Sequence, residues 1–132
     1  MYKIMWLLRR KPGISLEQFR HHYETTHSVL GQKYLGHLIE SYVRNYDLAN
    51  AEGAEPAART SGFDCITEWV LPDEGAMDEI MRILHDPVIG KLFHEDEEHF
   101  LDRNSVTLVR CDSRDTGSGD GAETLRLFAK QT

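Results

Sequence analysis

Residues 11–36 decide the fold, and they read KPGISLEQFRHHYETTHSVLGQKYLG. The stretch opens with a Pro-Gly turn signal, and Ser15 with Gln18 then matches a capping box, in which each side chain binds the other residue's backbone amide. A helix is therefore expected from Ser15 to about Gly36. At about 100° per residue, its large apolar and aromatic side chains fall within an arc of roughly 80°, which predicts one buried stripe. The stripe consists of Leu16, Phe19, Tyr23, Leu30 and Tyr34.

The sequence around this helix alternates between strand and helix patterns. Four strands are expected at residues 2–9, 38–47, 63–71 and 105–111, and two further helical stretches run from Asp73 to about His85 and from Pro87 to about Asp102. The resulting order, β-α-β-β-α-β, predicts an α+β ferredoxin-like fold, with helices on one face of an antiparallel sheet. The other sheet face carries apolar side chains that one subunit cannot bury, so a two-fold homodimer is expected.

The ends of this unit define the expected domain organisation. Residues 1–112 form the ferredoxin-like domain, residues 113–122 a Gly- and Ser-rich flexible linker, and residues 123–132 a tail with an extra C-terminal strand near Leu125 to Ala129. That strand is expected either to pair with a partner's sheet edge or to fold onto its own subunit. Residues 49–61 are small and acidic, and they are expected to form a lid-like loop.

Composition limits which kinds of partner and which cellular location are expected. The chain has 132 residues and a net charge of -7, which disfavours nucleic acid and anionic membranes because phosphates would be repelled. No apolar run is long enough to span a membrane, and the one near the N-terminus is too short for a signal peptide, so a cytoplasmic location is expected. Cys65 and Cys111 match no metal or redox spacing and are interpreted as buried small residues.

His27 is the most informative single residue. On a regular helix it lies about 20–40° from the centre of the apolar stripe, between Tyr23 and Leu30. One interpretation is a core histidine with satisfied nitrogens, and the other is a general acid or base, because a half-desolvated imidazole is a natural proton carrier. His21 and His22 point to other sides of the helix and are interpreted as surface residues.

Three carboxylates are further candidates. Asp96 falls in the middle of the apolar face expected on the last helical stretch, where a carboxylate must be paired. It is interpreted as a residue that orients His27, caps a local break in the helix or binds a backbone amide. That face is expected to comprise Val88, Ile89, Leu92, Phe93 and Phe100. Asp64 and Glu68 share one face of the third strand, and Glu68 is expected to be the more buried and perturbed of the two.

Aromatic side chains complete the expected pocket, and no metal or cofactor is expected. Tyr23, Tyr42 and Trp6 are candidate pocket walls, where a phenol can hold an oxyanion. His94 and His99 lie five residues apart and diverge by roughly 140° on a helix, unlike the zinc motif with its spacing of four. The sequence contains no phosphate-cradling glycine loop, serine elbow or dinucleotide fingerprint.

Three stretches also occur in a recognisable order. They are KPGISLEQF at 11–19 with YETTH at 23–27, FDCITEW at 63–69, and EDEEHFLD at 95–102. Together they resemble the EthD-domain family, over about residues 2–111. The resemblance implies a dimeric α/β barrel, whose relatives include methylmuconolactone isomerases, polyketide cyclases and dehydratases, and quinone-forming monooxygenases. It also implies that His27 matches the helix histidine that transfers protons in the isomerases, whereas their second catalytic histidine has no counterpart, since His37 lies too early.

The leading hypothesis is a cofactor-independent enzyme acting on a small, oxygenated, largely apolar substrate. His27 would move a proton next to a carbonyl in a dehydration, cyclisation or isomerisation, with Glu68 or Asp96 orienting its ring. Tyr23 or Tyr42 would stabilise the developing oxyanion. Two alternatives stay open: a cofactor-free monooxygenase, and a non-catalytic small-molecule binder or accessory protein of a catabolic oxygenase.

Overall fold

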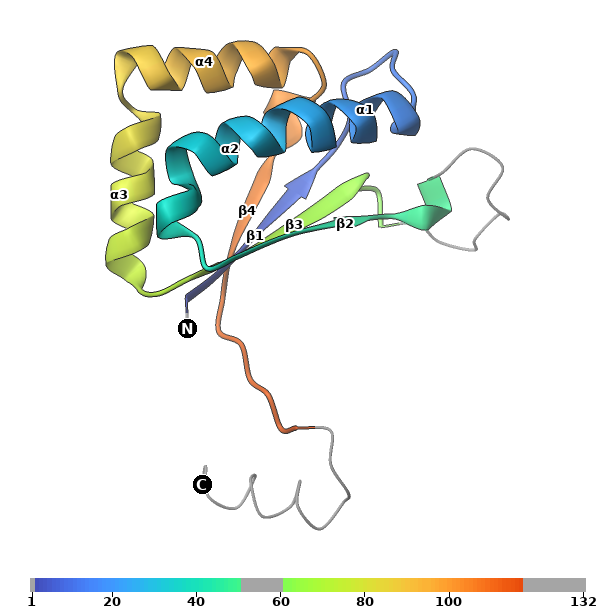
Figure 1. The fold of residues 1–132 in the computed structure, drawn as a ribbon. Helices are drawn as coiled ribbons and strands as arrows, with labels where there is room; N and C mark the ends of the chain where they lie inside the picture. The colour runs from blue at the N-terminus through green and yellow to red at the C-terminus, as the bar shows by residue number, and fades with distance from the viewer. Residues whose placement is uncertain (1, 51–60, 118–132) are drawn as a thin grey trace.

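A four-stranded antiparallel sheet with helices on one face forms the body of the computed structural model, which describes residues 2–50 and 61–117 (Figure 1). The strands are β1 (Tyr2–Leu8), β2 (Ser41–Tyr46), β3 (Cys65–Leu71) and β4 (Thr107–Cys111), in the spatial order β2-β3-β1-β4. This arrangement confirms the expected ferredoxin-like α+β fold. The extra C-terminal strand and most of the expected lid lie outside the described residues.

The first helical segment of the chain is interrupted by a π-helical turn. It consists of α1 (Leu16–His22), the π-helical turn Tyr23–His27 and α2 (Ser28–Leu35). The capping box is present, with Ser15 N–H donating to Gln18 Oε1 at 2.9 Å and Gln18 N–H donating to Ser15 Oγ at 3.0 Å. The helix therefore begins where the sequence predicts, but it is not a continuous α-helix.

The second helical segment consists of α3 (Glu74–Leu84) and α4 (Pro87–Glu98), which meet at a corner (Figure 1). Asp73 caps α3 by accepting from the Ala76 N–H, and Asp86 caps α4 by accepting from the first free amides, with proline at its start. At the corner, a Cβ on Gly90 would collide with the Leu84 carbonyl, so glycine permits the close approach. The helix α4 ends before the expected Asp102.

Alternation along the strands fixes which side chains face the helices. On β3 the buried residues are Cys65, Thr67, Trp69 and Leu71. Across the sheet, Ile4 lies opposite Trp69 and Trp6 lies opposite Thr67, so the even-numbered residues of β1 share that face. The helix-facing side of the sheet is thus largely aromatic and apolar.

The other face of the sheet is open in the single subunit. It carries Met5, Leu7, Val43, Ile66, Val70 and Val109 around an ion pair between Lys3 and Glu68. Val43 and Val109 are 42% and 38% exposed, which leaves apolar surface uncovered.

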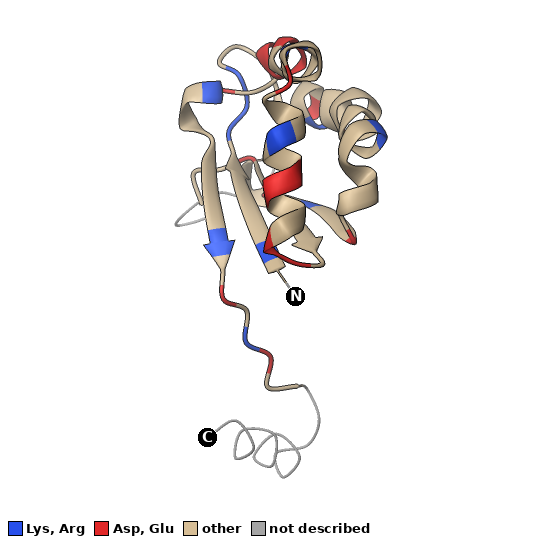
Figure 2. Ribbon diagram, turned by 90° about the vertical axis from the view of Figure 1, so that its left-hand side faces the viewer, with Lys and Arg blue, Asp and Glu red and all other residues tan. Residues whose placement is uncertain are grey.

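Around α3 and β4, acidic and basic residues lie side by side, as in the pairs Arg82–Glu79 and Arg110–Glu74 (Figure 2). Among the helices of the described residues, none has the length and hydropathy needed to span a bilayer.

Candidate functional site

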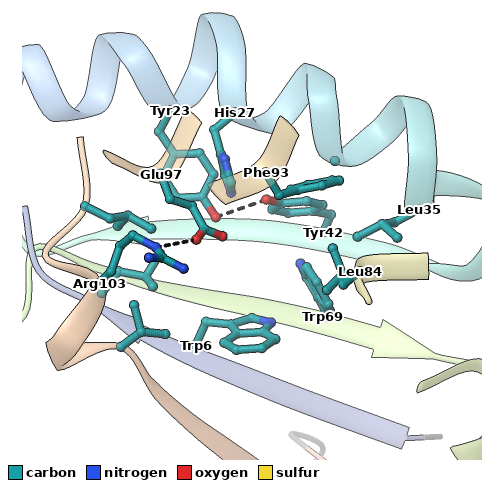
Figure 3. A pocket seen from close by; sticks show the side chains of 14 residues that line it. Trp6, Tyr23, His27, Leu35, Tyr42, Trp69, Leu84, Phe93, Glu97 and Arg103 are labelled. Carbon is teal, nitrogen blue, oxygen red and sulfur yellow. Dashed lines mark hydrogen bonds and ion pairs between the residues drawn. The ribbon is translucent and has the colours of Figure 1, made fainter. Parts of the chain in front are cut away.

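A cavity of about 290 Å³ lies between the helices and the sheet, beneath the π-helical turn. Trp6 and Trp69 rise from the sheet, Tyr23 and His27 descend from the π-helical turn, and Phe93 enters from α4 (Figure 3). The mouth carries an ion pair in which Arg103 Nε donates to Glu97 Oε2 at 3.1 Å. The walls are otherwise mostly apolar, as in small-molecule sites.

His27 makes the strongest polar contact at this cavity. Its Nδ1 lies 2.7 Å from Asp96 Oδ2, and the two side chains are 13% and 10% exposed. An ionised carboxylate only accepts hydrogen bonds, so Nδ1 carries a proton, and the neutral form of the ring has its lone pair on Nε2. The imidazole is also packed against aromatic rings, with centroid distances of 4.9 Å to Phe100 and 5.3 Å to Tyr23.

His22 binds the other oxygen of the same carboxylate. Its Nε2 lies 2.8 Å from Asp96 Oδ1, and its ring packs against Phe100 with a centroid distance of 4.8 Å. The interpretation of His22 as a surface residue is therefore wrong, because its side chain is half-buried and bonded, whereas His21 is exposed as expected. Asp96 thus bridges two histidines of one helical segment.

The π-helical turn explains this bridge. The Ser28 N–H donates to the carbonyl of Tyr23, five residues back. Residues five apart diverge by about 140° on an α-helix. In a π-helical turn, whose hydrogen bonds join residues five apart, the angle between such residues is much smaller. His22 and His27 therefore reach the same carboxylate.

Asp96 is ionised at neutral pH. Burial by itself would raise the pKa of this carboxyl, but the hydrogen bonds from His27 and His22 outweigh burial and lower its pKa below the ordinary 3.8.

Only part of the apolar face expected on α4 is buried. Phe93, Asp96 and Phe100 are buried, but Val88 and Leu92 are exposed, because the rest of the subunit covers only one side of this helix.

Two tyrosine hydroxyls form a chain beside the imidazole. Tyr23 Oη lies 3.0 Å from Tyr42 Oη and 2.7 Å from Thr67 Oγ1. Burial raises the pKa of Tyr23 well above its ordinary value and raises the pKa of Tyr42 to about 12. Both phenols are therefore neutral at physiological pH. Each hydroxyl has a single proton, so when Tyr23 accepts from Thr67 and donates to Tyr42, the Tyr42 proton is available to a ligand.

Glu68 does not reach this site, which corrects the expectation that it orients His27. It lies on the open face of the sheet, where its Oε1 is 2.6 Å from Lys3 Nζ. The reason is strand alternation, because Thr67 and Trp69 take the helix-facing positions on either side of it.

Asp64 is also not placed at the cavity. Its carboxylate accepts from the Arg10 backbone N–H at 2.8 Å and from Asn50 Nδ2 at 3.3 Å, so it ties the start of β3 to two connecting segments. It is 6% exposed and more buried than Glu68, the reverse of the expected order.

The structure brings together five of the seven expected site residues and adds others. His27, Asp96, Tyr23, Tyr42 and Trp6 meet at or beside the cavity. The sequence interpretation missed His22, Thr67 and Trp69. For the last two a signal existed, because they alternate with Glu68 along β3 and only one of the two faces meets the helices.

Metal ligation has no support in residues 2–50 and 61–117, where no three His, Cys, Asp or Glu side chains gather as ligands. His94 Nε2 instead lies 2.9 Å from Glu98 Oε1, and the His99 ring lies 5.8 Å from that of His22.

Comparison with protein families matches residues 11–104 to the EthD domain. Among solved structures, an EthD family protein from Bacillus halodurans is 22% identical, with a TM-score of 0.59 over 86% of this chain and 100% of that one. An antibiotic biosynthesis monooxygenase is 16% identical, with a TM-score of 0.53 over 87% and 100% of the two chains. A dimeric ferredoxin-like protein of unknown function from Thermobifida fusca is 16% identical, with a TM-score of 0.52 over 83% and 88%. Curated proteins gave no match.

Proposed function

The chain belongs to the EthD domain family, and from that membership and its buried His–Asp pair we propose a cofactor-independent enzyme that transfers a proton on a small, oxygenated, largely apolar molecule. The observation that carries the proposal is His27 Nδ1, 2.7 Å from the Asp96 carboxylate at the wall of an apolar cavity. A neutral imidazole held in one tautomer at the wall of a largely apolar cavity is suited to general base catalysis.

The proton transfer follows from this geometry. His27 Nε2 takes a proton from a carbon next to a carbonyl group, and the imidazolium that forms is stabilised by the ionised Asp96. Asp96 stays deprotonated throughout and acts as a positioning residue. The proton is then returned from Nε2 to another carbon in an isomerisation. In a cyclisation the carbanion bonds to a second carbonyl carbon and that oxygen takes the proton, and in a dehydration the proton goes to a hydroxyl group whose C–O bond breaks to release water.

The tyrosine chain supplies the complementary charge stabilisation. As the proton leaves the carbon, negative charge develops on the carbonyl oxygen. Tyr42 is a neutral phenol at the cavity that can donate to this oxygen while it accepts from Tyr23, and a preorganised hydroxyl in a low-dielectric site stabilises such an oxyanion.

Deuterium exchange tests the proposal without knowledge of the natural substrate. 2-Tetralone has acidic protons beside its carbonyl, and NMR in D₂O measures their exchange above the buffer rate. We expect the chain to accelerate exchange, His27→Phe to abolish the acceleration, and His21→Phe, which removes an exposed histidine of the same helix, to retain it. Binding of 2-tetralone with no His27-dependent exchange would favour the alternative, a non-catalytic binder or an accessory protein of an oxygenase.

Cofactor-free oxygenation is a second candidate, favoured by the fold shared with an antibiotic biosynthesis monooxygenase. The same base would remove the proton of a phenol or anthrone, and the resulting electron-rich carbanion or phenolate would then react with molecular oxygen. Oxygen uptake with anthrone, dependent on His27, separates this reaction from isomerisation.

We further propose that a second copy covers the open sheet face, as in a dimeric α/β barrel. The support is the apolar surface around Val43 and Val109, together with a structural neighbour described as dimeric. A cytoplasmic location and the lack of nucleic-acid partners remain predictions from composition.

A further inference from the structure

Two indole N–H groups at the cavity have no acceptor among the residues that the structure describes. The Nε1 atoms of Trp6 and Trp69 are both buried, and no side chain or backbone group of residues 2–50 and 61–117 accepts from them. Buried donors are almost always paired in folded proteins, and an unpaired one is destabilising. Both residues line the cavity, so an unpaired donor there points to an acceptor that arrives with a ligand.

Trp69 is the better placed of the two donors. It is 7% exposed, and its nitrogen faces the tyrosine hydroxyls, whereas the Trp6 nitrogen faces the Trp69 ring (Figure 3). The Trp69 N–H lies near enough to Tyr42 to be one of the weaker influences that lower that phenol's pKa, but the two groups lack hydrogen-bond geometry. The Trp6 and Trp69 rings meet edge to face, with centroids 5.3 Å apart, so both indoles are fixed by packing.

The charges at the cavity restrict the ligand further. Arg103 is the sole Lys or Arg among the lining residues, and Glu97 already neutralises it at the mouth. His27 faces the ionised Asp96. A buried carboxylate ligand would lack a counter-charge, which is strongly unfavourable, whereas a neutral carbonyl oxygen needs only donors.

We propose that the molecule on which the proposed enzyme acts is a neutral carbonyl compound, such as a ketone, quinone or lactone, whose carbonyl oxygen accepts a hydrogen bond from Trp69 Nε1. This inference rests on the proposed function for the presence of a substrate at the cavity. The volume of about 290 Å³ is near the lower limit of small-molecule pockets, which begin at roughly 300 Å³, and therefore suits one or two fused rings.

Indole N–H resonances test this inference directly. The chain has two tryptophans, so a ¹⁵N-labelled sample gives two indole signals, assigned by Trp6→Phe and Trp69→Phe. Three probes share one bicyclic frame: 2-tetralone, the hydrocarbon tetralin, and 1,2,3,4-tetrahydro-2-naphthoate. We expect 2-tetralone to move the Trp69 indole proton downfield and tetralin to leave it without a downfield shift.

Affinities provide a second measure. Because it lacks one hydrogen bond, tetralin is expected to bind about 3- to 10-fold more weakly than 2-tetralone. The carboxylate probe is expected to bind more than about 10-fold more weakly than 2-tetralone. Trp69→Phe should reduce the affinity for 2-tetralone to that for tetralin and leave tetralin binding unchanged. Equal binding of ketone and hydrocarbon, or tighter binding of the carboxylate, would overturn the inference.

The same samples separate this inference from the proposed function. An indole shift without His27-dependent exchange leaves the ligand class standing and refutes the enzyme. His27-dependent exchange without an indole shift leaves the enzyme standing and refutes the hydrogen bond from Trp69. In His27→Phe, the 2-tetralone shift at Trp69 is expected to persist.

Discussion

His22 and His27 contact the two oxygens of a single carboxylate, at 2.8 Å and 2.7 Å from Asp96 Oδ1 and Oδ2. Each histidine thereby restricts the rotation of the carboxylate that holds the other. One ring, that of His27, lines the cavity, whereas His22 borders an open surface depression that also contains His21 and His99. The carboxylate therefore couples a ring at the cavity to a half-buried ring that borders the surface depression.

Asp96→Asn should impair the base more than it impairs ligand binding. The amide is nearly the same size but no longer fixes the His27 tautomer or stabilises the imidazolium, so 2-tetralone exchange should fall by about 100-fold or more. The affinity for 2-tetralone should stay within about threefold, because Asp96 makes no expected ligand hydrogen bond. Exchange kinetics and titration measure the two effects, and an equal loss in both would show a general structural role. Chemical shifts of the His27 ring nitrogens should report mixed tautomers in the variant.

Stability should depend on Asp96 at low pH. The folded-state pKa of this carboxyl is below its ordinary value of 3.8, so the folded chain binds this proton more weakly than the unfolded chain does. The stabilisation is thus fully present above about pH 4 and is lost as the pH falls through the folded-state pKa. In urea unfolding at pH 6, the free energy of unfolding of Asp96→Asn should be lower than that of the parent chain by about 1–3 kcal/mol. This difference should become smaller below pH 4. A difference that stays constant down to pH 2 would contradict this assignment.

His22→Phe tests the surface side of the bridge. The phenyl ring keeps the packing against Phe100 but removes the hydrogen bond to Asp96 Oδ1. Because His27 remains bonded, we expect partial loss of exchange, about 3- to 10-fold, and a destabilisation of about 1 kcal/mol. His21→Phe is the matched control with no expected effect. A complete loss of exchange in His22→Phe would make His22 as important as His27.

Gly31→Leu should close the cavity without removing a donor or the base. A Cβ at Gly31 would lie 3.4 Å from Tyr42 Cε2, an ordinary contact, so a longer side chain must extend into the cavity that Gly31 lines. Affinities for 2-tetralone and tetralin should then fall together by at least about tenfold, unlike the selective loss in Trp69→Phe. Helix stability should be maintained, because leucine is favoured over glycine in helices by roughly 0.8 kcal/mol. Gly31→Ala is the milder control.

Val43→Lys should separate the proposed dimer. Val43 lies on the open sheet face opposite Glu68, and a second copy would bury it. Because Glu68 is already paired with Lys3, a second lysine beside it would be buried without a carboxylate of its own, which is unfavourable, so sedimentation velocity should shift from dimer to monomer. Val29→Lys places the same charge at an exposed position on α2 and should leave the dimer intact. A monomeric parent chain would refute the assembly.

The His27–Asp96 pair was within reach of the sequence because both residues interrupt apolar helical faces, and a buried carboxylate requires a partner. His22 was out of reach because the prediction assumed 3.6 residues per turn throughout. No residue in Tyr23–His27 is a proline or glycine that would signal a departure from the α-helix.

Glu68 shows a different limit of the sequence. Alternation along β3 separates two faces correctly, with Glu68 on one and Thr67 and Trp69 on the other. It does not say which face the helices cover, since both carry apolar side chains. The two buried aromatic neighbours, Trp6 and Trp69, settle that choice only once the sheet is assembled.

The π-helical turn also carries a consequence for how relatives are lined up. It accommodates one inserted residue while the flanking helices keep their directions, so the same bridge on an uninterrupted α-helix would need histidines four positions apart. Family members with a regular helix here should therefore be one residue shorter between the two histidines. An alignment that forbids a gap in this turn will pair His27 with the wrong residue of such a member and hide an equivalent histidine.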